Sequence, residues 1–186
     1  VLQTTVSEVE ELVMLEGSAV RCDGKSASLT APNGQAQRQV ISAAFAVAQV
    51  APAMLILMEA HGTGTALGDP MEMGSVNAVV LKHRDAHAAP MAVGSMKANA
   101  GHSEPGAGFS GLLKLVIGLS RGDAAPNAQL CALNPHLGST LHGVNCALPS
   151  QLGGPALEAQ LGGVSSFGYS GTIAHAVLCH LGGDGK

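Results

Sequence analysis

Residues 59–70 place a histidine beside small and hydroxyl-bearing residues that can bind a ligand. An imidazole has an ordinary pKa of about 6.5, so His61 can exchange protons near neutral pH. The neighbouring glycines let backbone amides approach a ligand closely, and Thr63 and Thr65 can hydrogen-bond it. The glycines miss the spacing of a dinucleotide-binding loop by one residue, and no phosphate loop of the Gly-Lys-Ser/Thr type follows. The segment therefore indicates acid–base chemistry rather than nucleotide binding.

A second histidine lies between a lysine and an acid. Lys97 precedes His102 by five positions, and Glu104 follows it by two. A protonated lysine favours the neutral imidazole, whereas a carboxylate favours the cation. The segment has two interpretations of similar weight: a catalytic group, or a polar loop that caps the helix after Pro105 through Ser103 or Glu104.

Residues 162–172 are rich in glycine and serine and contain Phe167 and Tyr169. Taken alone, the segment is typical of a β-hairpin with a tight turn. Such a turn can also direct a backbone N–H at a developing oxyanion.

The composition excludes several classes of protein. Hydrophobic residues make up 46% of the chain and charged residues 12%, which is typical of a packed core and not of a disordered segment. The net charge of −4 and the 2% content of aromatic residues argue against nucleic-acid binding. No apolar run is long enough to span a bilayer. The residues at the start carry no basic stretch of the kind that opens a signal peptide.

The remaining cysteines and histidines do not form a recognisable metal site. The four cysteines are scattered without a CxxC pair, so we expect reduced thiols and an intracellular protein, cytoplasmic or plastid. His83 and His87 have helical spacing, but the polar residues around them favour a solvated helix end. The other histidines are interpreted as structural: His136, His142, His175 and His180.

Apolar periodicity and turn residues divide the chain into alternating strands and helices. Strands are expected at 17–20, 54–58, 90–95, 142–147, 161–167 and 172–179, and helices at 35–50, 69–82 and 106–119. This order predicts a layered α/β domain with a mixed, largely parallel sheet. In such sheets ligands bind beyond the carboxyl ends of the strands, so His61 and the segment 97–102 are expected to converge.

The three segments, in their order and spacing, resemble β-ketoacyl synthases, particularly the ketosynthase domains of type I polyketide synthases and fatty acid synthases. The resemblance covers residues 17–178 and implies the C-terminal half of a thiolase-like fold. Residues 1–20 are expected to be the end of a preceding region with a strand, 17–180 the domain, and 181–186 a flexible tail. The resemblance is carried by EAHGTGTALGDPMEMGS, GSMKANAGHSEPGAGFSGLLKL and GGVSSFGYSGTIAHAVL.

The resemblance implies a decarboxylative Claisen condensation in polyketide or fatty acid biosynthesis, with malonyl-type extender units on acyl carrier protein. His61 and His102 match the two catalytic histidines. Lys97 matches a lysine that orients the second of them, and Glu104 an acid in a supporting network. Four residues match positions that bind the phosphopantetheine arm or the acyl chain: Thr63, Thr65, Phe167 and Tyr169. The phosphopantetheine of the carrier protein is the substrate carrier, and no bound cofactor and no metal are expected.

The chain also departs from the family. The nucleophilic cysteine before a serine on a strand–helix elbow is absent, so the chain alone is expected to be inactive as an acyltransferase. Ile173 stands where the family usually has Asn, and Arg21-Cys22 where it has Asn-Gln. The implied partners are an N-terminal ketosynthase half with the cysteine, acyl carrier protein, and a second copy in a homodimer of the complete domain.

Two other functions remain open. One is a non-catalytic thiolase-like partner or carrier-protein docking module, although docking alone does not require His61 or His102. The other is a thiolase-like acyltransferase without decarboxylation. The second histidine argues against it, because in the family that residue marks the decarboxylating branch.

Overall fold

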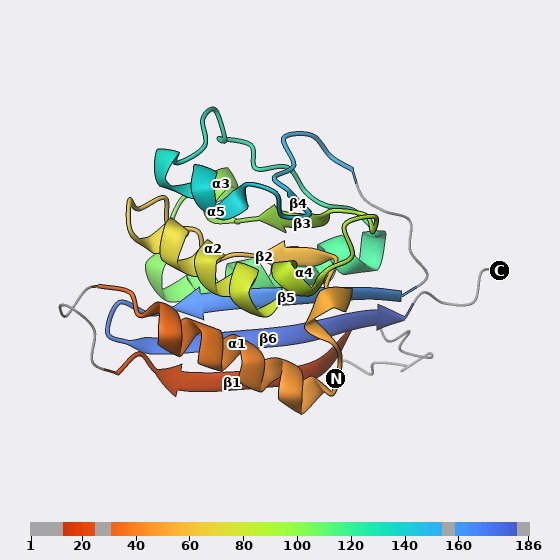
Figure 1. Cartoon of the computed structure of the whole chain (residues 1–186), viewed down its shortest axis with the longest axis horizontal. Coiled ribbons are helices and arrows are strands. Elements are labelled where there is room, and N and C mark those ends of the chain that lie inside the picture. The colour runs from red at the N-terminus through yellow and green to blue at the C-terminus, as the bar shows by residue number, and fades with distance from the viewer. Residues whose placement is uncertain (1–12, 25–30, 154–158, 182–186) are drawn as a thin grey trace, which may run out of the picture.

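The computed structural model describes residues 13–24, 31–153 and 159–181. One mixed sheet has the strand order β1-β6-β5-β2-β3-β4 (Figure 1). Its strands are β1 (Met14–Cys22), β2 (Leu57–Glu59), β3 (Met91–Gly94), β4 (Cys146–Ala147), β5 (Ala159–Phe167) and β6 (Thr172–Leu181). Three neighbouring pairs are parallel and two are antiparallel, which confirms the predicted α/β class with a mixed sheet.

Helices cover both faces of the sheet (Figure 1). They are α1 (Gly34–Ala48), α2 (Gly68–Val79), α3 (Lys97–Ala100), α4 (Ala107–Arg121) and α5 (Gly138–Leu141). On one face α1 packs on β1 and β6 and contacts α2, and on the other α4 packs on β5 and β2. Each face has its own hydrophobic cluster, and the one beneath α1 and α2 is the larger.

Helix α1 begins where the sequence places a turn. The side-chain oxygen of Asn33 accepts the N–H groups of Gln35 and Ala36 at 3.0 and 3.2 Å, which satisfies two amides that the helix itself leaves unpaired. The helix lies close against β1 because Gly17 has no side chain. A Cβ at this position would lie 2.5 Å from the carbonyl oxygen of Ala44. The backbones of strand and helix are therefore in direct contact.

The structure shortens two predicted strands: only Cys146–Ala147 of the strand expected at 142–147 forms β4, and the run 54–58 is shortened as well. The apolar run 54–58 is expected to be extended, but Pro52–Met54 forms a 3-10 turn and β2 contains only Leu57–Glu59. Pro52 has its φ fixed by the ring and favours the first position of a helical turn. Pairing with β5 begins one residue earlier, where Ile56 N–H donates to the carbonyl of Leu161 at 3.0 Å.

The predicted boundaries at residues 20 and 181 can be compared with the first and last strands of the sheet. Strand β1 pairs with β6 along nearly its whole length. The sheet therefore includes residues 14–20, which were predicted to belong to the end of a preceding region. Strand β6 continues to Leu181, and the rest of the predicted tail, 182–186, lies outside the described residues. No described helix has the length and apolar character needed to cross a membrane.

Candidate active site

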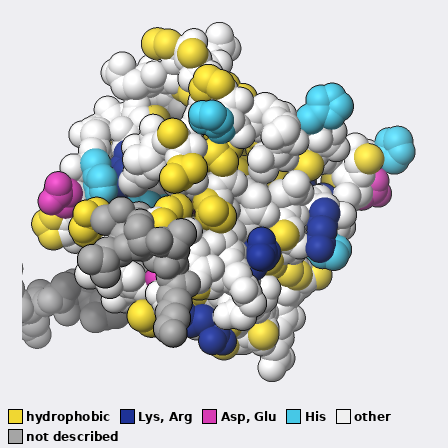
Figure 2. Space-filling view, turned by 60° about the vertical axis from the view of Figure 1, so that its left-hand side comes forward, with side chains coloured by type: hydrophobic (Ala, Val, Ile, Leu, Met, Phe, Trp, Pro, Cys, Tyr) yellow, Lys and Arg dark blue, Asp and Glu magenta, His cyan; other side chains and the backbone are white. Residues whose placement is uncertain are grey.

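The carboxyl ends of β2, β3 and β5 meet at one edge of the sheet and place the candidate residues together. A cleft of about 830 Å³, here called the site cleft, opens at this edge. Figure 2 turns this side of the molecule forward and shows histidine and hydrophobic side chains gathered there. The site cleft is lined by six of the eight predicted site residues: His61, Thr63, Thr65, His102, Phe167 and Tyr169.

His61 follows β2 and is half-buried. Its Nδ1 accepts the backbone N–H of Phe167 at 3.3 Å, and the Lys97 ammonium lies 3.4 Å from the same atom. Burial, followed by the positive charge of Lys97 and by His102, lowers the pKa of His61 from 6.5 to about 4. His61 is therefore neutral at pH 7. Because Nδ1 accepts a hydrogen bond, the proton of the neutral ring lies on Nε2.

Lys97 begins α3 directly after β3 and is half-buried. The resemblance implies that it acts on His102, whereas the structure places its ammonium beside His61. Burial lowers the pKa of Lys97, while the carboxylates of Glu72 and Glu59 act in the opposite direction. The ammonium thus contacts the first histidine, and the charges of two buried acids favour its protonated form.

His102 lies on the exposed loop after α3 and meets His61 edge to face. The two ring centroids are 5.9 Å apart and the rings are perpendicular. The backbone N–H of Glu104 donates to Nδ1 of His102 at 3.1 Å, while the Glu104 side chain is exposed. The contact that the structure gives Glu104 with His102 therefore runs through its backbone and not its carboxylate.

The alternative capping role of this loop is wrong. A 3-10 turn, Glu104–Gly106, separates the loop from α4, and Gly106 is the residue before α4. Among the described residues the Ser103 side chain makes no capping hydrogen bond, and Gly106 has no side chain that could make one. Glu104 instead has a left-handed backbone, with φ of 41°. A non-glycine residue in this conformation is strained, and such strain is concentrated at functional sites.

The threonines and the hairpin turn form the rim of the site cleft. Thr65 accepts the N–H of Gly68 through Oγ1 at 3.0 Å, and its Oγ1 lies 3.4 Å from that of Thr63. Tyr169 lies at the tip of the β5–β6 turn with 83% of its surface exposed. The ring of Phe167 packs against the His61 ring, with centroids 5.5 Å apart.

Glu72 in α2 is the main site residue that the sequence interpretation missed. Its side chain is 3% exposed. One carboxylate oxygen accepts the backbone N–H of His61 at 2.7 Å and the other accepts that of Gly62 at 2.9 Å. Burial raises the pKa of Glu72 to about 7 despite these two donors. The signal that could have found it is its place in the first turns of a helix that follows the histidine loop.

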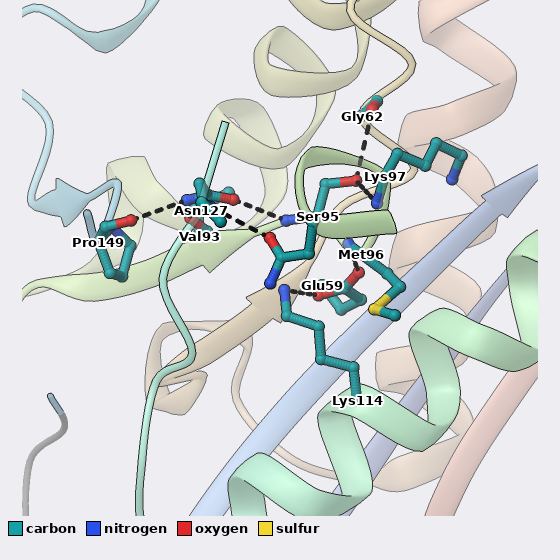
Figure 3. Close-up of polar contacts among 11 residues, drawn as sticks. Glu59, Gly62, Val93, Ser95, Met96, Lys97, Lys114, Asn127 and Pro149 are labelled. Atoms are coloured by element: carbon teal, nitrogen blue, oxygen red, sulfur yellow. Dashed lines mark hydrogen bonds and ion pairs between the residues drawn. The ribbon is translucent and has the colours of Figure 1, made fainter. Parts of the chain in front are cut away.

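A polar network behind the cleft joins the loops after β2 and β3 (Figure 3). Ser95 Oγ donates to the carbonyl of Gly62 at 3.3 Å and accepts the N–H of Lys97 at the same distance. The buried Asn127 side chain accepts Ser95 N–H at 3.0 Å and donates to the carbonyl of Val93 at 3.1 Å. These hydrogen bonds hold the backbone of Lys97 close to the His61 loop.

Glu59 and Lys114 extend this network to α4 (Figure 3). The Glu59 carboxylate, 4% exposed, pairs with the Lys114 ammonium at 2.7 Å and also accepts the backbone N–H of Met96. Burial raises the pKa of Glu59, which Lys114 partly offsets. The pair fixes the end of β2 against both α4 and the Lys97 loop.

A second cleft of about 740 Å³ lies beside the site cleft. Both clefts are lined by Thr63, Glu72 and His102, so His102 lies between them. The described residues contain no group of three or more histidine, cysteine or acidic side chains that could hold a metal ion.

His61 and His102 thus meet at the carboxyl ends of the parallel strands of a mixed α/β sheet. The family model described as "Beta-ketoacyl synthase, C-terminal domain" matches residues 12–130. The chain belongs to this family, and the predicted resemblance is confirmed.

The curated relatives are large polyketide synthases. Polyketide synthase ThaG of Burkholderia thailandensis is 41% identical over 175 residues, which cover 89% of this chain and 3% of that protein. The spectinabilin polyketide synthase system protein NorA' of Streptomyces orinoci is 41% identical over 167 residues, covering 90% of this chain and 5% of the relative. The chain thus spans a small part of the relatives that it matches.

Solved ketosynthase domains share the fold. The oxazolomycin ketosynthase domain OzmH KS7 of Streptomyces albus matches with a TM-score of 0.81 and 31% identity, covering 91% of this chain and 30% of that one. The ketosynthase from module 6 of the bacillaene synthase of Bacillus subtilis matches with the same TM-score and 28% identity, covering 91% and 31%. These matches confirm the thiolase-like fold.

Proposed function

We propose that this chain supplies the histidine pair of a ketosynthase that extends an acyl chain by decarboxylative Claisen condensation. The observation that carries the proposal is the placement of His61 and His102 in one cleft, with ring centroids 5.9 Å apart and with threonines at the rim. Two imidazoles at this separation can both approach a single thioester oxygen. Hydrogen-bond donors at a developing negative charge stabilise a transition state strongly.

His61 acts as a donor in this scheme. Its Nδ1 already accepts a hydrogen bond from Phe167, so the N–H on Nε2 remains for a ligand. Because the pKa of His61 is about 4, the ring is neutral at physiological pH and carries a single proton, on Nε2. A donor of this kind stabilises the enolate oxygen of a decarboxylating malonyl thioester without titrating during the reaction.

The condensation conserves atoms and electrons in two steps. The bond between the carboxylate carbon and the α-carbon of the malonyl thioester breaks. The carboxylate leaves as carbon dioxide, and the electron pair of the broken bond forms the enolate. The enolate carbon then attacks the acyl–cysteine carbonyl, a new carbon–carbon bond forms, and the cysteine leaves as a thiolate that takes up one proton. The cysteine is the contribution of an N-terminal half, because no cysteine of this chain lies in a nucleophile motif.

The carrier arm is proposed to enter the site cleft along its rim. Thr63 and Thr65 offer hydroxyl groups to the amides of phosphopantetheine, and Tyr169 and Phe167 offer aromatic surface to the thioester. Acyl carrier protein presents this arm from outside. The condensation takes place inside the cell, in a homodimer of complete ketosynthase domains.

The face of α4 is the proposed contact with the N-terminal half. Phe109, Leu113 and Ile117 lie one turn apart along this helix and are 65%, 46% and 53% exposed. Side chains at i, i+4 and i+8 form one stripe on a helix. Neighbouring apolar side chains that remain in water mark an interaction surface.

Reconstitution tests the proposal. The chain is mixed with the N-terminal half of a polyketide synthase ketosynthase, and release of labelled carbon dioxide from malonyl-carrier protein is measured. We expect release only from the pair and a loss of about 100-fold or more in His102→Ala. The matched control His83→Ala changes an exposed histidine outside the site and retains activity.

A second variant tests the pairing surface separately. Ile117→Asp places a charge within the apolar stripe of α4, and we expect it to prevent co-elution of the two halves on size-exclusion chromatography. An assembled pair that releases no carbon dioxide would sink the catalytic proposal. Pairing that survives Ile117→Asp would sink the assigned interface.

A further inference from the structure

His175 is a buried polar residue to which the proposed reaction gives no role. It lies in β6 with 2% of its surface exposed, directly opposite Ser165 of β5 in the antiparallel register. Nδ1 of His175 and Oγ of Ser165 are 3.0 Å apart, and Ser165 is 3% exposed. The two side chains form a hydrogen-bonded cross-strand pair inside the hydrophobic cluster beneath α1.

The imidazole occupies space that the opposite strand leaves free. A Cβ at Gly163 would lie 3.1 Å from Cε1 of His175, so the ring fills the place of a Gly163 side chain. On its other side the ring packs against Phe45, with centroids 5.9 Å apart. The burial lowers the pKa of His175 from 6.5 to about 4 and keeps the ring neutral.

This arrangement costs free energy that an apolar residue would avoid. Within the described part of the chain, Nε2 of His175 is buried without a hydrogen-bond partner. A buried polar atom left unpaired costs about 1–3 kcal/mol. A leucine would fill much of the same space without this penalty. The imidazole therefore contributes something other than burial, and the contact it makes is the hydrogen bond to Ser165.

The Ser165–His175 pair lies near the hydrogen bond that joins the β5–β6 hairpin to His61. Phe167 is two residues beyond Ser165 on the same strand, and it pairs with Ile173, two residues before His175. Residues two apart in a strand share a face. The N–H of Phe167 donates to Nδ1 of His61. A slip of one residue between β5 and β6 would turn every side chain of the sliding strand to the other face and break this geometry.

We propose that the Ser165–His175 pair is a positioning device that fixes the β5–β6 register, so that the Phe167 N–H holds His61 in its Nε2-protonated form. The inference rests on the proposed function, which makes that form the donor to the enolate. Neither residue touches the substrate, and both act through Phe167.

The test observes His61 and Phe167 directly in the 186-residue chain. His175→Leu and Ser165→Ala each remove the hydrogen bond. In both variants we expect the backbone amide signal of Phe167 to shift, and the pKa of His61, titrated by NMR of its ring, to rise, because the neutral ring loses a donor to Nδ1. His175→Leu removes the unpaired nitrogen but leaves the buried Ser165 hydroxyl without its partner, so the two effects on stability oppose each other, and urea unfolding checks that each variant is folded.

The matched control is His180→Gln, a change of another β6 histidine that lies toward the far end of the hairpin, opposite Gln160. It should leave both signals unchanged. If His175→Leu folds and leaves the Phe167 amide and the His61 titration as in the wild type, the pair serves packing alone and the proposal is wrong.

The readout also separates this proposal from the proposed function. Neither NMR signal depends on carbon dioxide release. Signals that move as expected, in a protein whose assembled pair releases no carbon dioxide, would uphold the positioning pair and refute the condensation.

Discussion

The two loops that carry the site histidines are held in different ways. In the first, the buried carboxylate of Glu72 binds the amides of His61 and Gly62, and Phe167 binds the His61 ring. In the second, His102 is exposed and its ring accepts one hydrogen bond, from the backbone of its neighbour Glu104. The first histidine is therefore held by hydrogen bonds with residues far apart in the sequence, whereas the hydrogen bond described for the ring of the second comes from a near neighbour and its other ring contact is with His61.

The largest effect on stability is expected at Glu72, which binds the backbone of the first loop. Glu72→Gln leaves one carbonyl oxygen for two amides, so one buried N–H loses its acceptor. We expect the free energy of unfolding to fall by about 1–3 kcal/mol. The measurement is urea unfolding at neutral pH, followed by circular dichroism.

The matched control for this variant is the same chemical change in the second loop. Glu104 is exposed, so Glu104→Gln should change the free energy of unfolding by less than about 0.5 kcal/mol. Equal losses in the two variants would remove the distinction between the loops.

A smaller effect is expected in the pH dependence of stability. The lowered pKa of His61 means that, between about 4 and 6.5, the unfolded chain binds a proton that the folded chain does not. The contribution of His61 to stability therefore rises with pH across this window, and that of His175 has the same sign, whereas the raised pKa of Glu59 acts in the opposite direction. Glu72, with its pKa raised to about 7, opposes this rise.

Lys97→Met tests how much the positive charge beside His61 contributes to the pH dependence of stability. Removing the cation lets the pKa of His61 rise, so the gain in stability between about pH 4 and 6.5 should become smaller. Urea unfolding at several pH values measures the slope. Lys82→Met, at an exposed lysine outside the site, serves as the control. An unchanged slope in Lys97→Met would mean that Lys97 does not lower the pKa of His61.

The smallest effect is expected in the second loop. Glu104 has a left-handed backbone, which glycine adopts without strain. Glu104→Gly should raise the free energy of unfolding by up to about 1 kcal/mol, whereas Glu104→Ala, which keeps a Cβ, should leave it nearly unchanged. Thermal unfolding of both variants provides the measurement. A loss of stability in the glycine variant would show that the carboxylate of Glu104 contributes to the fold.

Much of the fold could be predicted because its elements obey local rules. Apolar spacing placed the three long helices and the β5–β6 hairpin to within a few residues. The run 54–58 was predicted incorrectly in part, because an apolar run has no periodicity that separates strand from turn, and Pro52 decided its start. The sequence also did not indicate the full length of β1, which was predicted only over 17–20 and extends over Met14–Cys22.

The site could be predicted only where its residues follow the strands directly. His61 and His102 converge as expected from the parallel sheet. Glu72 was missed because its contact with the His61 loop depends on how α2 packs, which spacing along the chain does not encode. For the same reason Lys97, expected beside His102, lies beside His61. Ile173, which stands where the family usually has Asn, is 1% exposed and pairs with Phe167.

The close fit between Gly163 and His175 has a consequence for how this domain can diverge. A Cβ at 163 would lie 3.1 Å from the ring at 175 and equally close to Leu55, so both neighbours would have to move by a few tenths of an ångström, while a smaller residue at 175 would leave a void above the glycine. Accepted substitutions at the two positions should therefore occur together, small with large and large with small. Lineages that have lost this histidine are expected to carry a bulkier residue at the position of the glycine.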